Sequence, residues 1–307
     1  MTENVSSLHV RNPHRNGYDF ELLTEYIPEL RDRLVRRSDG GTTIDFSKQR
    51  DVFLLNRALL FAHYKIRYWK LPDAYLCPGV PGRVDYLLYL SQLAGKSVPK
   101  GENIRLLDIG TGASCIYPLL ANKLFGWSSV ASDIDKITID FALENVDKND
   151  LSSKIKVRRQ SDSNSYFNGI ISEGERFDFT ICNPPFFKSR KDAEAANIRK
   201  NKNLKGSKKS SLNFGGKSHE LWVKGGELAF IKSMILESRS YQQQVFWFSS
   251  LVSDRRNLKS LTRTLQQTTA DYQLIEMEHG LKKIHALAWT FLDEKLQKLW
   301  SEARWSR

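Results

Sequence analysis

The chain has 307 residues, of which 40% are hydrophobic and 27% are charged, as in a globular protein with room for one large α/β domain and an appendage, or for two ordinary domains. It has no run of 18 apolar residues and no secretory signal at its polar N-terminus, so we expect a soluble, intracellular protein. The net charge of +12 favours a polyanionic partner, most economically a nucleic acid.

The first 80 residues are predicted to form a small, mainly helical module. Helices are expected at 18–37 and 47–65, on either side of a turn at 39–41. Basic residues, Arg11 and Arg15 among them, are interleaved here with tyrosines. We interpret the module as RNA-binding, with solvated helix faces as the alternative because acidic residues are nearly as numerous.

A glycine-rich motif follows a Pro/Gly-rich linker at 77–83 and an apolar helix at 84–93. Residues 104–116 are predicted to form a strand, a tight turn and the start of a helix, and the glycines of the turn let the backbone approach a ligand closely. A second strand at 129–133 ends in Asp133, roughly 20 residues later, where an acid can take both hydroxyls of a ribose. This spacing favours a nucleotide-type cofactor.

A rigid turn, Asn183 to Phe187, ends a predicted buried strand at 177–182. Its two prolines cannot donate hydrogen bonds to a sheet. The asparagine amide and nearby backbone carbonyls can hold an amino group on a planar ring, and an aromatic ring can stack on that ring. The alternative is a turn that only ends the strand.

The segment 188–219 lacks apolar periodicity and is rich in lysine. We expect a mobile basic loop that clamps phosphates. Its candidate RNA contacts are Lys200, Lys205, Lys208 and Lys209.

The remaining segments alternate between helix and strand. Helices are expected at 137–149, 227–240 and 257–268, and strands at 155–157, 245–251, 272–278 and 284–291. Because so short a turn joins the last two strands, they must form an antiparallel hairpin.

The whole pattern predicts an α/β fold built on a doubly wound, seven-stranded sheet with one reversed strand. We expect this domain to span residues 81–295, after the N-terminal module at 1–80 and before a tail at 296–307. The glycine turn and the Asn-Pro-Pro turn then share one sheet edge, where a cofactor and an acceptor can lie face to face. The three cysteines and six histidines follow no ligand spacing, so no metal is expected.

Four segments of the chain resemble class I S-adenosylmethionine-dependent methyltransferases, and specifically the methyltransferase-like protein 16 family of RNA adenosine-N6 methyltransferases. They are Leu107 to Leu120, Asn183 to Phe187, Gly225 to Leu228 and Ala286 to Trp289, and the resemblance spans roughly residues 8–292. It implies methylation of a specific adenosine in structured RNA, with U6 small nuclear RNA expected first, and therefore a nuclear location. Ribosomal RNA or DNA adenine methylation stays open as an alternative. An RNA-binding protein without catalysis is an alternative of another class.

The resemblance also implies roles for particular residues. The expected contacts to S-adenosylmethionine are Arg83, Asp108, Gly110, Gly112, Ser114, Asp133 and Asn164. The acceptor site would comprise Asn183, Pro184, Pro185 and Phe186, with Phe187 beside the base. Arg11 and Arg15 would contribute to the RNA groove, as would Lys282 and Lys283, which stand where arginines are expected. We expect a monomer.

Overall fold

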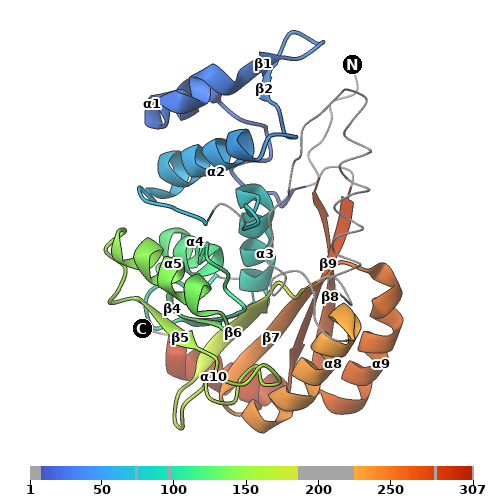
Figure 1. Ribbon diagram of the computed structural model, residues 1–307. Helices are drawn as coiled ribbons and strands as arrows, with labels where there is room; N and C mark the ends of the chain where they lie inside the picture. The colour runs from blue at the N-terminus through green and yellow to red at the C-terminus, as the bar shows by residue number, and fades with distance from the viewer. Residues whose placement is uncertain (1–7, 73–74, 96–97, 186–224, 280–281, 306–307) are drawn as a thin grey trace.

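A mostly parallel sheet forms the centre of the molecule (Figure 1). The computed structural model describes residues 8–72, 75–95, 98–185, 225–279 and 282–305. The strands are β3 (Arg105–Ile109), β4 (Ser128–Asp133), β5 (Ile155–Arg159), β6 (Phe177–Cys182), β7 (Val245–Val252), β8 (Asp271–His279) and β9 (Lys282–Thr290). Their order is β5-β4-β3-β6-β7-β9-β8, and β9 runs antiparallel to both neighbours. The predicted seven-stranded sheet with one reversed strand is confirmed.

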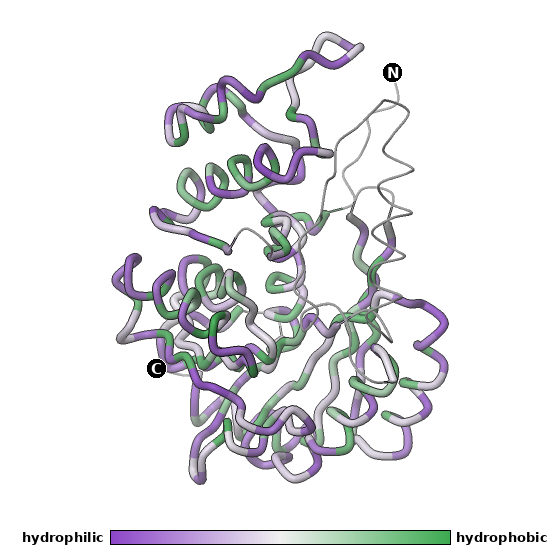
Figure 2. Tube along the Cα trace, in the orientation of Figure 1, coloured by the Kyte–Doolittle hydropathy of each residue, from purple (hydrophilic) through white to green (hydrophobic). Residues whose placement is uncertain are grey.

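Two hydrophobic layers cover the two faces of this sheet, because successive side chains of a strand point to opposite sides. The helices are α3 (Val80–Gln92), α4 (Ile116–Phe125), α5 (Lys136–Asp147), α8 (Gly226–Ser238), α9 (Leu258–Thr268) and α10 (Glu294–Trp305). Leu106 packs with α3, α4 and α5, whereas its neighbour Leu107 packs with α8 and α9. Figure 2 shows the apolar segments gathered on the strands and the polar ones on the outer turns of the helices. Within the described ranges, no helix could cross a membrane.

The N-terminal elements lie above this sheet in Figure 1 and share its core. They are α1 (Phe20–Tyr26), the 3₁₀ helix η1 (Pro28–Arg33), the hairpin strands β1 (Leu34–Arg36) and β2 (Thr42–Ile44), and α2 (Gln49–Tyr64). The prediction of one helix over 18–37 is therefore wrong. Pro28 disfavours helical backbone at Ile27, whose ψ is 85°, so α1 ends there.

Helix α3 also begins earlier than expected. Its first turn is Val80–Arg83, which the sequence placed in a linker. Pro81 is tolerated in that turn because the first N–H groups of a helix need no partner within it. Arg83 consequently projects from a helix and not from a loop.

The predicted tail contains most of α10, and this helix is anchored to the amino edge of the sheet. The anchor is Asp178 of β6, which is fully buried. Its carboxylate accepts hydrogen bonds from the indole nitrogens of Trp300 and Trp305, both at 2.8 Å. Arg304 adds two further bonds at 2.8 and 2.9 Å. One carboxylate thus accepts four hydrogen bonds from the last turns of the helix, and Arg304 donates another to the Asn103 carbonyl at 2.8 Å.

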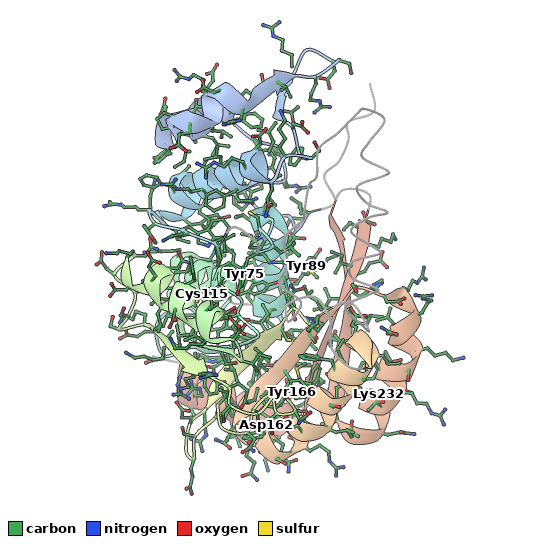
Figure 3. All side chains as sticks on the ribbon, viewed as in Figure 1. Tyr75, Tyr89, Cys115, Asp162, Tyr166 and Lys232 are labelled. Atoms are coloured by element: carbon green, nitrogen blue, oxygen red, sulfur yellow. The ribbon has the colours of Figure 1, made fainter. Side chains whose placement is uncertain are left out.

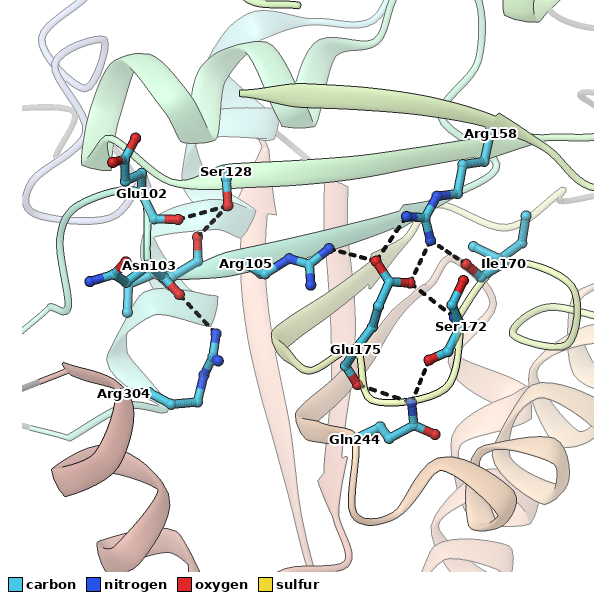
Figure 4. A network of polar contacts seen from close by, with 11 residues as sticks. Glu102, Asn103, Arg105, Ser128, Arg158, Ile170, Ser172, Glu175, Gln244 and Arg304 are labelled. Carbon is cyan, nitrogen blue, oxygen red and sulfur yellow. Dashed lines mark hydrogen bonds and ion pairs between the residues drawn. The ribbon is translucent and has the colours of Figure 1, made fainter. Parts of the chain in front are cut away.

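A second polar network closes the same edge (Figure 4). Glu175 accepts hydrogen bonds from Arg158 at 2.6 and 2.8 Å and from Arg105 at 2.9 Å. The Arg158 guanidinium holds the pKa of Glu175 down to about 2. The amino edge is therefore stabilised by charge pairs, while the carboxyl edge stays open for a ligand.

Candidate active site

The two predicted turns meet because their strands are neighbours. β3 and β6 pair in parallel, and Ile109 lies opposite Cys182 in the register. The next residues along the two strands, Gly110 and Asn183, therefore leave the sheet side by side at its carboxyl edge. In open α/β sheets this edge is where ligands bind.

A cavity of about 450 Å³ opens at this point. Of the residues expected at the site, Arg83, Gly110, Gly112, Ser114, Asp133, Asn164, Asn183 and Pro185 line it. The residues lining it that were not expected include Tyr75, Thr111, Tyr117, Tyr166 and Phe230. Figure 3 labels Tyr75 and Tyr166, which come from segments far apart in the chain. Asp108 and Pro184 are buried and do not line the cavity.

The glycine turn has backbone angles that favour glycine. Gly110 and Gly112 have φ of +69° and +65°, which place both in the left-handed region. The Asp133 carboxylate fixes the turn, since its Oδ2 accepts the Gly112 N–H at 3.1 Å. Burial raises the pKa of Asp133, and the backbone N–H groups of Asp135 and Gly112 oppose that shift. The acid at the end of β4 therefore both holds the turn and faces the cavity.

Three buried side chains at this turn present polar atoms that lack a hydrogen-bond partner within the described part of the chain. They are both oxygens of Asp108, Oγ1 of Thr111 and the hydroxyl of Tyr117. Buried polar atoms in folded proteins almost always have partners, so this cluster suits a ligand with complementary charges. Burial raises the pKa of Asp108 to about 7. A neighbouring ammonium group would restore its charge.

Arg83 supplies the positive charge next to this cluster. Its guanidinium carbon lies 5.5 Å from the centre of the Tyr117 ring, within the range of a cation–π contact. Together the guanidinium and the phenol offer donors to a carboxylate, while Asp108, buried behind the lining, adds a negative charge that attracts an ammonium. These groups therefore suit the amino-acid part of S-adenosylmethionine.

The cavity lining also includes aromatic rings and the Asn-Pro-Pro turn. Asn183 and Pro185 are half-buried there. The rings of Tyr166 and Phe230 pack edge to face with centres 4.7 Å apart. The two rings add apolar surface to the cavity lining, suited to contact with a planar base or with the cofactor's adenine. Phe186 and Phe187, expected beside the base, lie outside the described residues.

The predicted RNA contacts lie apart from the cavity lining. Arg11 is exposed and Arg15 is half-buried, on the segment that precedes α1. Lys283 of β9 is exposed but ion-paired with Glu276 at 2.6 Å and with Glu278 at 3.4 Å. The four lysines of the 188–219 loop and the side chain of Lys282 fall outside the described residues.

Sequence reasoning missed the aromatic and hydroxyl residues of the cavity. Tyr117 is the second residue of α4 and lines the cavity. In the sequence, only its position just after the glycine turn indicated a place at the site. Tyr75, Tyr166 and Phe230 come from three separate segments and reach the site only through the tertiary fold.

This sheet order, with a glycine turn and an Asn-Pro-Pro turn on one cavity, defines a class I methyltransferase domain. A family described as RNA methyltransferase matches residues 2–293, and the chain belongs to that family. The predictions of fold class, family and methyltransferase activity are thereby confirmed.

Relatives from bacteria are similar over nearly the whole chain. Ribosomal RNA large subunit methyltransferase F of Bacteroides fragilis is 46% identical, over 93% of this chain and 99% of that protein. The Cytophaga hutchinsonii protein of the same name is 43% identical, over 97% of this chain and 95% of that protein.

Solved structures of human METTL16 share the fold. The catalytic domain in complex with MAT2A 3'UTR hairpin 1 is 32% identical, covers 94% of this chain and 96% of its own, and has a TM-score of 0.80. The N-terminal domain in complex with SAH is 28% identical, covers 93% of this chain and 99% of its own, and has a TM-score of 0.75.

Proposed function

We propose that this protein methylates the exocyclic N6 amine of a specific adenosine in large-subunit ribosomal RNA. The observation that carries the proposal is the pairing of Ile109 with Cys182, which sets the glycine turn and the Asn-Pro-Pro turn on one cavity. A methyl donor held by the first turn then faces an amine held by the second.

S-adenosylmethionine is the cofactor, and when bound it supplies an electrophilic methyl group. Arg83 and Tyr117 would hold its carboxylate, since both line the cavity and lie next to each other. Asp108, which is buried behind the lining, would favour its ammonium through its negative charge. Asp133 would bind the ribose hydroxyls and Asn164 the adenine; both residues line the cavity.

The Asn183 side chain has the chemistry to position the acceptor amine. The lone pair of an adenine amine is delocalised into the ring, which makes the amine a poor nucleophile. Two acceptors, Asn183 Oδ1 and the Pro184 carbonyl, can bind its two hydrogens and favour the form with an exposed lone pair. Such alignment is a proximity and orientation effect, which lowers the activation barrier of methyl transfer by roughly several kcal/mol. The amine becomes acidic only after methylation, so no strong base is needed beforehand.

Ribosomal RNA is preferred to U6 small nuclear RNA because of the relatives. The two relatives named above are ribosomal RNA enzymes at 43% and 46% identity, whereas the two METTL16 structures described above are 28% and 32% identical. The expectation of a U6 target thus becomes the second candidate. The nuclear location expected with it loses its support, because those relatives are bacterial proteins.

The test is methyl transfer from labelled S-adenosylmethionine to four acceptors: large-subunit ribosomal RNA, U6 RNA, duplex DNA and protein. Label should enter ribosomal RNA at one adenosine, and digestion to nucleosides should give N6-methyladenosine. Exclusive labelling of U6 RNA would favour the second candidate. Binding of the cofactor without transfer to any acceptor would contradict the proposal.

A further inference from the structure

The segment Lys65–Pro72, here called the strap, connects α2 to the cavity and contacts the back of the glycine turn. It leaves the end of α2 and passes next to α5 (Figure 1). Asn149, just beyond α5, fixes its course. The Asn149 side chain accepts the Arg67 N–H at 2.9 Å and donates to the Tyr68 carbonyl at 2.7 Å. The strap is therefore held by side-chain bonds along its length.

Trp69 of the strap binds the turn directly. Its indole Nε1 donates to the Ser114 carbonyl at 3.0 Å, and the side chain is 3% exposed. Its ring stacks on Phe53 of α2 with centres 5.6 Å apart and planes 9° apart. Because the indole is held flat against α2, its N–H points to one fixed carbonyl.

Asn145 of α5 binds the preceding carbonyl of the turn. Its fully buried amide donates to Ala113 O and to Lys70 O, both at 2.9 Å, and accepts the Lys70 N–H at 2.8 Å. One side chain thus joins the strap, α5 and the turn.

The bonds from Trp69 to Ser114 O and from Asn145 to Ala113 O set the directions of two peptide groups at the cavity. In a trans peptide the C=O and the following N–H point in opposite directions, and the described chain has no cis bond. Holding Ala113 O therefore fixes the direction of the Ser114 N–H. Holding Ser114 O fixes the Cys115 N–H, which closes the turn on Gly112 O at 3.2 Å.

We propose that Trp69 and Asn145 are positioning residues for the cofactor: they hold the glycine turn in its ligand-binding shape from behind. Neither lines the cavity, whereas Gly112 and Ser114 do. The inference rests on the proposed function, because it takes S-adenosylmethionine as the ligand of that turn.

The test compares two tryptophan-to-phenylalanine variants. Trp69→Phe keeps an aromatic ring on Phe53 but removes the N–H donor to the turn. Trp127→Phe is the matched control, because the fully buried Trp127 donates in the same way to the Pro99 carbonyl at 2.8 Å, outside the cavity lining. Both variants lose one indole-to-carbonyl bond, so both should unfold at lower urea concentrations than the wild type.

Only Trp69→Phe should bind S-adenosylhomocysteine more weakly in calorimetry, by about three- to tenfold, as expected for one lost hydrogen bond. Its KM for the cofactor should rise by a similar factor, with kcat changed by less than about twofold, as for lost uniform binding. Equal affinities in the wild type and Trp69→Phe, or equal weakening in both variants, would overturn the inference. A wild-type protein that does not bind the ligand would instead overturn the proposed function.

Discussion

Asn183 is the residue on which the chemistry depends most. We expect Asn183→Ala to lower kcat at least about a hundredfold, because a misplaced acceptor loses the benefit of alignment. Its affinity for S-adenosylhomocysteine should stay near that of the wild type, since the cofactor groups lie on the other turn. Single-turnover methylation and calorimetry measure the two effects. Asn168→Ala, at an exposed position outside the cavity lining, is the control and should behave as wild type. Normal turnover by Asn183→Ala would refute the positioning role.

Asp108 should make cofactor binding depend on pH. Burial raises its pKa to about 7, so below that pH the free protein carries a proton on Asp108. A bound ammonium group favours the ionised carboxylate, so binding displaces this proton. Affinity for S-adenosylhomocysteine should therefore weaken as the pH falls from about 8 to about 6, with proton release measurable by calorimetry in buffers of different ionisation enthalpy. Asp108→Asn should bind more weakly and lose this dependence. A wild-type affinity that is constant across the window would contradict the assignment.

At the scale of elements, Asp178 is an anchor of α10. The buried carboxylate accepts bonds from two indoles and one guanidinium, so Asp178→Asn leaves the half-buried Arg304 without its counter-charge. We expect a loss of about 3 kcal/mol in the free energy of unfolding, measured with urea, as for breaking a buried ion pair. The control, Asp140→Asn, breaks an exposed pair with Lys136 and should cost less than about 1 kcal/mol. Comparable losses in both variants would show that α10 does not depend on this carboxylate.

At the scale of the whole molecule, the net charge of +12 should govern RNA affinity. The logarithm of the association constant should fall linearly with the logarithm of salt concentration, because basic side chains release counterions from phosphates. Replacing the exposed Arg11 by Gln should reduce that slope by up to about 1. Lys283→Gln should change it less, since Glu276 and Glu278 already pair with that lysine. Filter binding at several salt concentrations measures the slopes, and a larger effect of Lys283→Gln would reverse this ranking of the two sites.

The sequence by itself determined the sheet and its two turns. Short local patterns predict strands and glycine turns, so the seven strands, the antiparallel hairpin of β8 and β9 and the shared edge of Gly110 and Asn183 followed from periodicity and spacing. Local reasoning failed where one residue overrode a pattern, as Pro28 did in the expected helix over 18–37.

Only the tertiary structure decided what surrounds those turns. Tyr75, Tyr117 and Phe230 reach one cavity from three distant segments, and no spacing along the chain links them. The same holds for Trp69 and Asn145 behind the glycine turn, whose hydrogen bonds join residues 32 to 75 positions apart. A local pattern can specify the backbone of a turn, but the groups that hold it and complete its binding site are selected by packing.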